Sequence, residues 1–159
     1  MIFVTLGTQD KPFDRIVKEI DELVSKKVIK EEVIIQCGSS NYKPQHCKII
    51  TFVPFEEFTN YIKKSSFIIC HGGVGSILDG LKNDKKVIAV PRLAKYKEQQ
   101  NDHQLQIIEQ FSKLSLIVPC ISEKDLAKCI KKVDSFTPGT YKSNNDNFVN
   151  LITNYIDNN

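Results

Sequence analysis

Two short glycine-containing segments hold the residues whose types and spacing are best suited to binding chemistry. One is Gly7 to Asp10, and the other is His71 to Ser76, with the sequence His-Gly-Gly-Val-Gly-Ser. Each follows an apolar run typical of a buried strand, and the second leads into a helical pattern. Glycines at such turns let backbone N–H groups approach an anion, and the dipole of a following helix favours negative charge. The pair predicts a phosphate-binding site, in which the Ser76 hydroxyl is a helix cap or a phosphate donor.

Neither segment is a standard nucleotide motif. The pattern GxxxxGK(S/T) is absent, and the first apolar run is not followed by GxGxxG, which weakens a dinucleotide interpretation. Glycines at strand–helix turns can also serve only tight packing and positive φ angles. That structural interpretation stays open for each segment taken alone, whereas two such segments at one edge of a sheet favour a ligand.

Asp79 and the polar segment after residue 90 supply further candidates. Asp79 follows Ser76 by about one helical turn, so its carboxylate can accept both hydroxyls of a ribose. The alternative for Asp79 is a favourable charge in the first turn of a helix. Further along, another helix is expected to begin near Asp102, His103 and Gln104, whose side chains supply donors and acceptors suited to sugar hydroxyls. Plain helix capping is the competing role. Arg92 and Lys95 either balance phosphate charge or are solvated.

Catalytic side chains are sparse. His71 is a candidate general base, although phosphate binding or support of its loop is the stronger interpretation. No Ser-His-Asp order and no cysteine nucleophile with an evident activator are present. A metal is not expected, because there is no Asp-x-Asp pair and the remaining candidate ligands lack the close paired spacing of a zinc site; these are His46, Cys47, Cys70 and His71.

Hydrophobic periodicity predicts the elements that must position these residues. Strands are expected at 1–6, 33–36, 48–52, 67–70, 87–90 and 116–118. Helices are expected at 13–27, 55–62, 76–82, 105–114 and 122–133. Strands that alternate with helices predict an α/β fold, with a Rossmann-like, doubly wound and mostly parallel sheet. Right-handed crossovers then bring the carboxyl ends of the strands to one edge, where ligands of such sheets bind.

Length and composition fit one ordinary globular domain. The chain has 159 residues, of which 41% are hydrophobic and 26% charged, so wholesale disorder is excluded. We expect the α/β domain to span 1–133, a polar linker to span 134–147, and an amphipathic C-terminal helix to span 148–157. The net charge is +3, with 22 basic and 19 acidic residues, so no dedicated nucleic-acid-binding arm is indicated.

Cellular placement is suggested by the cysteines and by the apolar runs. Five cysteines, an odd number, are widely spaced, and a strand pattern begins at Met1 with no signal peptide before it. These features favour reduced thiols in a cytoplasm. No apolar run approaches the roughly 20 residues that span a bilayer. We therefore expect a cytoplasmic protein that does not cross a membrane by itself.

Taken together, the segments resemble the C-terminal, donor-binding half of GT-B glycosyltransferases. The resemblance runs from Met1 to about Val133 and rests on four pieces in order, which are Ile2–Thr8, Phe13–Arg15, His71–Ser76 and Glu98–Gln104. More closely, the chain resembles the stand-alone subunits of two-component bacterial polysaccharide glycosyltransferases. These are related to the catalytic subunit of the dolichol-linked GlcNAc transferase and to the peptidoglycan lipid-intermediate GlcNAc transferase.

The resemblance implies a UDP-sugar donor and no cofactor. Carried over by position, it assigns diphosphate contacts to the two glycine segments, ribose contacts to Asp79, and recognition of the sugar to the start of a later helix. The residues so assigned are Gly7, Thr8, His71, Gly73, Gly75, Ser76, Asp79, Asp102, His103 and Gln104. Asp79 stands where Glu is common in relatives, and His71-Gly72-Gly73 departs from the common His-Ala-Gly.

The resemblance also implies partners. It indicates a membrane-anchored, acceptor-binding glycosyltransferase subunit and a lipid-linked glycan acceptor, with the chain held peripherally at the inner face of the membrane. The helix at 148–157 would then dock on that partner or pack on its own domain. The expected reaction is inverting transfer of a sugar from UDP in polysaccharide biosynthesis. The alternatives are a non-catalytic stabilising or binding subunit, and another UDP-sugar-using α/β enzyme such as an epimerase or hydrolase.

Overall fold

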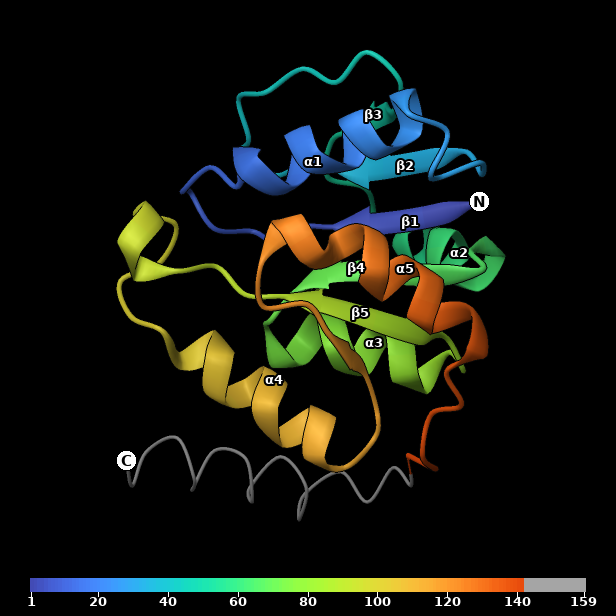
Figure 1. Ribbon diagram of the computed structural model, residues 1–159. Helices are drawn as coiled ribbons and strands as arrows, with labels where there is room; N and C mark the ends of the chain where they lie inside the picture. Colours follow the sequence, from blue (N-terminus) through green and yellow to red (C-terminus); the bar gives the residue numbers. More distant parts are fainter. Residues whose placement is uncertain (142–159) are drawn as a thin grey trace.

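A computed structural model describes residues 1–141 as an α/β domain in three layers (Figure 1). The predicted C-terminal helix at 148–157 lies outside the described residues, as does the part of the predicted linker from 142 to 147. Residues 136–141 follow the last described helix, and the Gly139 N–H donates to the Ser115 carbonyl at 2.8 Å.

The central sheet is built from short strands, and the inner four are mostly buried and rich in apolar residues. Its six strands are β1 (Ile2–Thr5), β2 (Val33–Gln36), β3 (Lys48–Ile50), β4 (Phe67–His71), β5 (Lys86–Val90) and β6 (Val118–Pro119). Their order is β3-β2-β1-β4-β5-β6, and every pairing is parallel. Strands covered on both faces need continuous apolar runs, which explains why the inner ones were recognisable in the sequence. The predicted Rossmann-like, doubly wound sheet is confirmed.

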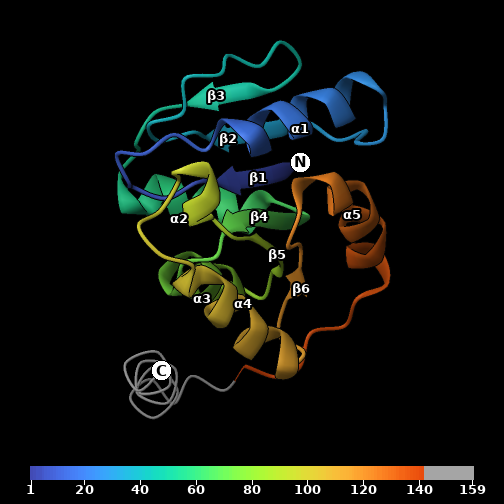
Figure 2. The ribbon, with the colours of Figure 1, turned by 60° about the vertical axis from the view of Figure 1, so that its left-hand side comes forward.

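Helices cover both faces of the sheet (Figures 1 and 2). They are α1 (Asp14–Ser25), α2 (Phe55–Lys64), α3 (Val74–Lys82), α4 (His103–Lys113) and α5 (Leu126–Ser135), with short 3-10 turns η1 (Ala94–Tyr96) and η2 (Glu123–Asp125). Helices α1 and α5 pack with Val4, Ile35 and Ile88 in one hydrophobic cluster. Helices α2, α3 and α4 pack with Phe3, Ile34 and Ile68 in the other. The alternation along each strand therefore divides the core between the two faces.

Some element boundaries differ from the prediction. Strand β4 includes His71, and α3 begins at Val74 instead of residue 76, so the second glycine segment is split between a strand end and a helix start. The last strand begins at Val118 instead of residue 116. The Leu116 N–H is bonded to the Phe111 carbonyl at 3.0 Å, which keeps Leu116 in the turn that ends α4.

The strand order creates a topological switch between β1 and β4. From β1 the chain crosses by α1 to β2 on one side, and from β4 it crosses by α3 to β5 on the other. The connections after these two neighbouring strands therefore diverge. In open α/β sheets, ligands bind in the crevice that such a divergence opens at the carboxyl edge.

Candidate functional site

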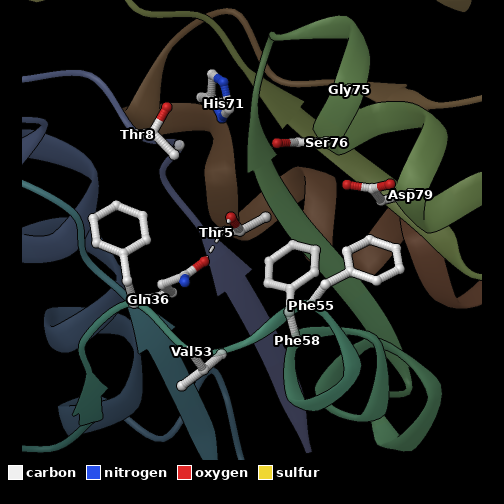
Figure 3. Close-up of a pocket in the computed structure, with 12 residues that line it drawn as sticks. Thr5, Thr8, Gln36, Val53, Phe55, Phe58, His71, Gly75, Ser76 and Asp79 are labelled. Carbon is white, nitrogen blue, oxygen red and sulfur yellow. Dashed lines mark hydrogen bonds between the residues drawn. The ribbon is translucent and has the colours of Figure 1, made fainter.

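A cleft of about 420 Å³ occupies the carboxyl edge of the sheet at this switch (Figure 3). Six of the residues assigned from the sequence line it: Gly7, Thr8, His71, Gly75, Ser76 and Asp79. Six further residues line it that were not assigned: Thr5, Gln36, Phe52, Val53, Phe55 and Phe58. The two glycine segments, more than sixty positions apart in the chain, therefore border one cavity.

The N-terminal end of α3 forms one wall of the cleft. Gly73 is its N-cap and provides no side-chain cap, and the first N–H bonded back to it belongs to Ile77, at 3.2 Å from the Gly73 carbonyl. The N–H groups at the start of the helix are thus not used by a capping side chain. The Ser76 hydroxyl makes no hydrogen bond to any residue between 1 and 141, and it points into the cleft (Figure 3). Such a wall suits an anion.

His71 is enclosed by the two glycine segments. A Cβ on Gly7, where φ is +77°, would lie 2.6 Å from His71 Cε1, and a Cβ on Gly73 would lie 2.4 Å from His71 Nε2. Both glycines are therefore required by the imidazole ring, and Gly7 is required also by its positive φ. Gly75 differs, because a Cβ there would meet no atom within 4 Å. The absence of a side chain at Gly75 leaves the cleft wall open.

The imidazole of His71 is neutral at physiological pH. Burial lowers its pKa to about 4, and the positive charge of Arg92 acts in the same direction, against a backbone hydrogen bond with Thr5. Its Nδ1 is buried and has no hydrogen-bond partner among the described residues. A base this weak is poorly matched to proton abstraction at neutral pH. A neutral imidazole can still donate a hydrogen bond to a ligand or accept one from it.

Asp79 projects from α3 into the same cleft (Figure 3). Its carboxylate is half-buried, and burial raises its pKa, while Lys82 acts in the opposite direction. Because α3 starts at Val74, its first turn contains no acidic residue. Asp79 is in the second turn, so the alternative of a favourable charge in the first turn does not apply to it.

The three residues assigned to the sugar lie outside the cleft lining. The Asp102 carboxylate accepts from the Ala94 N–H at 2.8 Å, and the buried Gln104 side chain accepts from the Arg92 N–H at 2.9 Å. His103 is the first residue of α4. Asp102 and Gln104 therefore fasten the segment that follows β5, and His103 lies between them.

Arg92 has a role that the sequence did not indicate. It is fully buried, so of the two alternatives given for it, that it is solvated is wrong. Its guanidinium donates to the carbonyls of Leu6 at 2.9 Å and Lys11 at 2.8 Å, and it stacks 4.8 Å from the centre of the Phe13 ring. Arg92 thereby fixes both ends of the first glycine segment. Lys95, the other cation of this region, is exposed.

Glu98 and Arg15 complete the fastening of this edge. Arg15 Nε lies 2.8 Å from Glu98 Oε1, and Arg15 Nη1 lies 2.7 Å from Glu123 Oε2. The second Glu98 oxygen accepts from the Leu93 N–H at 3.1 Å. These contacts join α1, the segment after β5 and the turn before α5. A glutamate that is 5% exposed needs such partners, because an unpaired buried carboxylate is strongly destabilising.

A smaller polar groove of about 230 Å³ lies at the same edge, between the segments that follow the parallel strands β1 and β5. Amide and charged side chains line it: Gln9, Asp10, Lys11, Gln99, Gln100 and Asn101. The Gln9 Oε1 is buried without a hydrogen-bond partner among the described residues. The groove therefore offers many donors and acceptors next to the first glycine segment.

Residues 1–141 contain neither a metal-ligand cluster nor a membrane-spanning helix. No cluster of three or more His, Cys, Asp or Glu side chains that could hold a metal ion is present in that range. None of the helices described there combines the length and the apolar character needed to cross a membrane.

Comparison with known proteins shows the family. The model of the glycosyltransferase family 28 C-terminal domain matches residues 1–156. The chain belongs to this family. Its sequence is 31% identical over 98 residues to the UDP-N-acetylglucosamine transferase subunit ALG13 of Candida albicans, an alignment that covers 62% of this chain and 32% of that protein. The chain thus spans about a third of the length of that relative.

Solved structures show the same fold. The solution structure of ALG13 has a TM-score of 0.64 at 22% identity, covering 98% of this chain and 96% of that one. MurG of Acinetobacter baumannii has a TM-score of 0.55 at 12% identity, covering 82% of this chain and 40% of that one. The glycosyltransferase SnogD of Streptomyces nogalater has a TM-score of 0.51 at 17% identity, with 84% and 38% covered. The resemblance to C-terminal halves of GT-B glycosyltransferases is confirmed.

Proposed function

We propose that this family 28 domain is the donor-binding subunit of a glycosyltransferase and that the cleft at the β1–β4 switch binds a UDP-sugar. The observation that supports this most directly is the polarity of the cleft. One wall presents the uncapped start of α3 with Ser76 and Asp79, and the other end is lined by Phe52, Val53 and aromatic residues of α2. A nucleoside diphosphate has the same polarity, with an anionic end and a flat, weakly polar base.

In this proposal each part of the donor has its own contacts in the cleft. The diphosphate lies against the N–H groups at the start of α3, with the hydroxyls of Thr8 and Ser76 and the neutral imidazole of His71 as further donors. The ribose hydroxyls are accepted by the Asp79 carboxylate. The base lies toward Val53. Gly75 leaves the wall open for the close approach of phosphate.

The sugar projects from the diphosphate toward the polar groove beside the first glycine segment. Gln99 and Gln100 line that groove and supply amide donors and acceptors suited to sugar hydroxyls. Asp102 and Gln104 contribute indirectly. Their side chains accept hydrogen bonds from the backbone of the segment after β5, which contains Gln99 and Gln100, and so hold that segment in place. We therefore propose a positioning role for Asp102 and Gln104 in place of a direct contact to the sugar, while the assignment of His103 to the sugar stays a prediction.

The reaction is inverting transfer to an acceptor hydroxyl. The acceptor oxygen forms a bond to the anomeric carbon as the bond from that carbon to the UDP oxygen breaks, and UDP leaves with the electron pair. The helix dipole and the N–H groups stabilise the charge that develops on UDP. The acceptor proton goes to a base outside this chain, since His71 is too weak a base at neutral pH.

A membrane-anchored partner subunit supplies the acceptor site and the base in this proposal, and a lipid-linked glycan is the acceptor. The support is similarity, because the relative from Candida albicans is named as a transferase subunit. A stabilising, non-catalytic role predicts that Asp79 variants leave activity of the assembled complex unchanged. An epimerase or hydrolase predicts a new product when this chain alone is incubated with a UDP-sugar.

Calorimetric titration of the chain with UDP tests the proposal. We expect saturable binding of UDP that is weakened about tenfold or more by Ser76→Ala and by Asp79→Ala, since each removes a polar contact to the ligand. Both variants should keep the wild-type unfolding midpoint. Ser112→Ala, on α4 away from the cleft, is the matched control and should bind UDP normally. A folded wild-type chain that does not bind UDP would refute the proposal.

A further inference from the structure

Two polar side chains lie at the floor of the cleft in otherwise apolar strands. Thr5 is the last residue of β1 and Gln36 the last of β2, and the two are register partners. They are only 2% and 6% exposed. Every other residue of these two strands is apolar and buried in the core. Their side chains are directed to the cleft and not to the hydrophobic clusters (Figure 3).

Among the described residues, only the oxygen of the Gln36 amide has a hydrogen-bond partner. The Thr5 hydroxyl donates to Gln36 Oε1 at 3.4 Å, shown by the dashed line in Figure 3. Gln36 Nε2 donates to none of the described residues. Gln36 Nε2 is not one of the side-chain atoms buried without a partner, so it reaches the cleft, where a ligand can accept from it. Because Thr5 occupies the oxygen, it is the NH₂ group that Gln36 offers to the cleft.

The surroundings of Gln36 suit a flat heterocycle. Phe58, Val53 and two unusually exposed aromatic residues line the same cavity; residues Phe52 and Phe55 are 57% and 76% exposed. Ser76 and Asp79 lie across the cleft on α3 (Figure 3). A ring held among the aromatic residues therefore has its sugar and phosphates toward α3 and one polar edge toward Gln36.

The following assignment rests on the proposed function and deepens it. We infer that Gln36, held in one orientation by Thr5, recognises the pyrimidine of the donor nucleotide and selects uracil over cytosine. Its Nε2 donates to the oxygen at C4 of uracil. Cytosine has an amino group at C4, which places a second donor against Nε2. A site built around one hydrogen bond rejects an analogue that leaves its buried polar group unpaired.

The test compares UDP with CDP, which differ only in the base edge. We expect the wild-type chain to bind UDP at least about tenfold more tightly than CDP. Gln36→Met keeps the length of the side chain but removes the amide, so UDP affinity should fall about tenfold and the preference should disappear. Gln45→Met makes the same change on an exposed loop outside the cleft and should leave both affinities unchanged.

Thr5→Val tests the orienting role. Without the hydroxyl the Gln36 amide is free to turn its oxygen toward the cleft, so CDP should bind more tightly and the preference for UDP should shrink. Asp79→Asn is the control, because it changes a proposed contact to the ribose and not to the base. It should weaken UDP and CDP equally, because both carry the same ribose, and the ratio of the two affinities should not change.

The outcomes separate this inference from the proposed function. Equal affinities of the wild-type chain for UDP and CDP, or an unchanged ratio in Gln36→Met and Thr5→Val, would overturn the role of Gln36 while leaving the cleft as a nucleotide site. Absence of binding to either nucleotide would overturn both. If Gln36→Met does not fold, Gln36→Glu decides, because a carboxylate accepts from the cytosine amino group and should reverse the preference; an unchanged preference refutes the inference.

Discussion

At the scale of single residues, Gly7, Gly73 and Gly75 are glycines for different physical reasons. Gly7 and Gly73 lie against the imidazole ring, whereas Gly75 faces open space in the cleft. The ring is held in an environment where its charged form is disfavoured. Glycines in both segments thus leave room for the His71 ring. In the proposed function, the two segments also border the diphosphate site.

Gly73→Ala and Gly75→Ala form a matched pair that separates these causes. Gly73→Ala should destabilise the fold by about 1–3 kcal/mol, because the new methyl group would overlap a buried ring. Gly75→Ala should leave stability equal or slightly higher, by up to about 1 kcal/mol, since alanine is favoured inside a helix. Urea denaturation measures both. Equal loss of stability in the two variants would contradict the packing described for His71.

His71 also predicts a dependence of stability on pH. Its folded-state pKa of about 4 lies below the ordinary value of about 6.5. Between these values the unfolded chain binds a proton that the folded chain does not, so the free energy of unfolding must fall as the pH is lowered from about 6.5 toward 4. The steepest loss from this group is about 1.4 kcal/mol per pH unit.

Replacement of His71 isolates that contribution. In His71→Asn the unfolding free energy should decrease less between about pH 6.5 and about pH 4.5 than in the wild-type chain. Urea denaturation at intermediate pH values gives the two slopes, and His103→Asn controls for the loss of a histidine elsewhere. Parallel slopes for wild type and His71→Asn would show that His71 is not held neutral by the fold.

At the scale of elements, long polar side chains join segments that the chain separates widely. Arg15 on α1 contacts Glu98 after β5 and Glu123 before α5. Arg92 contacts the segment between β1 and α1. These contacts fix the edge of the sheet at which the cleft and the smaller polar groove lie. The shape of the candidate site is therefore set by a network that does not itself line the main cleft.

Glu98→Ala should be among the more damaging substitutions at this edge. It leaves Arg15 without one of its carboxylates and removes the negative charge near the buried Arg92, so we expect a loss of about 3 kcal/mol in unfolding free energy. Glu22→Ala, which breaks an exposed pair with Lys26 on α1, should cost less than about 0.5 kcal/mol. Similar losses in thermal or urea unfolding would rule out the fastening role of Glu98.

At the scale of the whole molecule, the sheet order decides where ligand chemistry can occur. With β1 and β4 adjacent, the two glycine segments meet across a single cleft, and α2 adds an aromatic end to it. Larger solved glycosyltransferases such as MurG share this fold over about 40% of their length. In the proposed function, this domain would bind and activate the donor, and a partner would supply the acceptor site and the remaining chemistry.

The sequence by itself determined the alternation of strands and helices, the parallel sheet and the edge at which Gly7, Ser76 and Asp79 lie. Apolar periodicity and glycine turns are local signals, and burial on both faces makes an inner strand such as β2 recognisable from its own residues. A departure such as the start of α3 at Val74 stayed within a few residues.

Only the tertiary structure decided which side chains meet. It placed Gln36 and Phe52 in the cleft, buried Arg92, and moved Asp102 and Gln104 away from the cleft lining into backbone hydrogen bonds. Glutamine, arginine and aspartate have long or polar side chains that serve equally well in solvent, in a site or in a buried network. Their partners can lie far away in the chain, 86 positions for Arg92 and Leu6 and 108 for Arg15 and Glu123, so no local pattern encodes the choice.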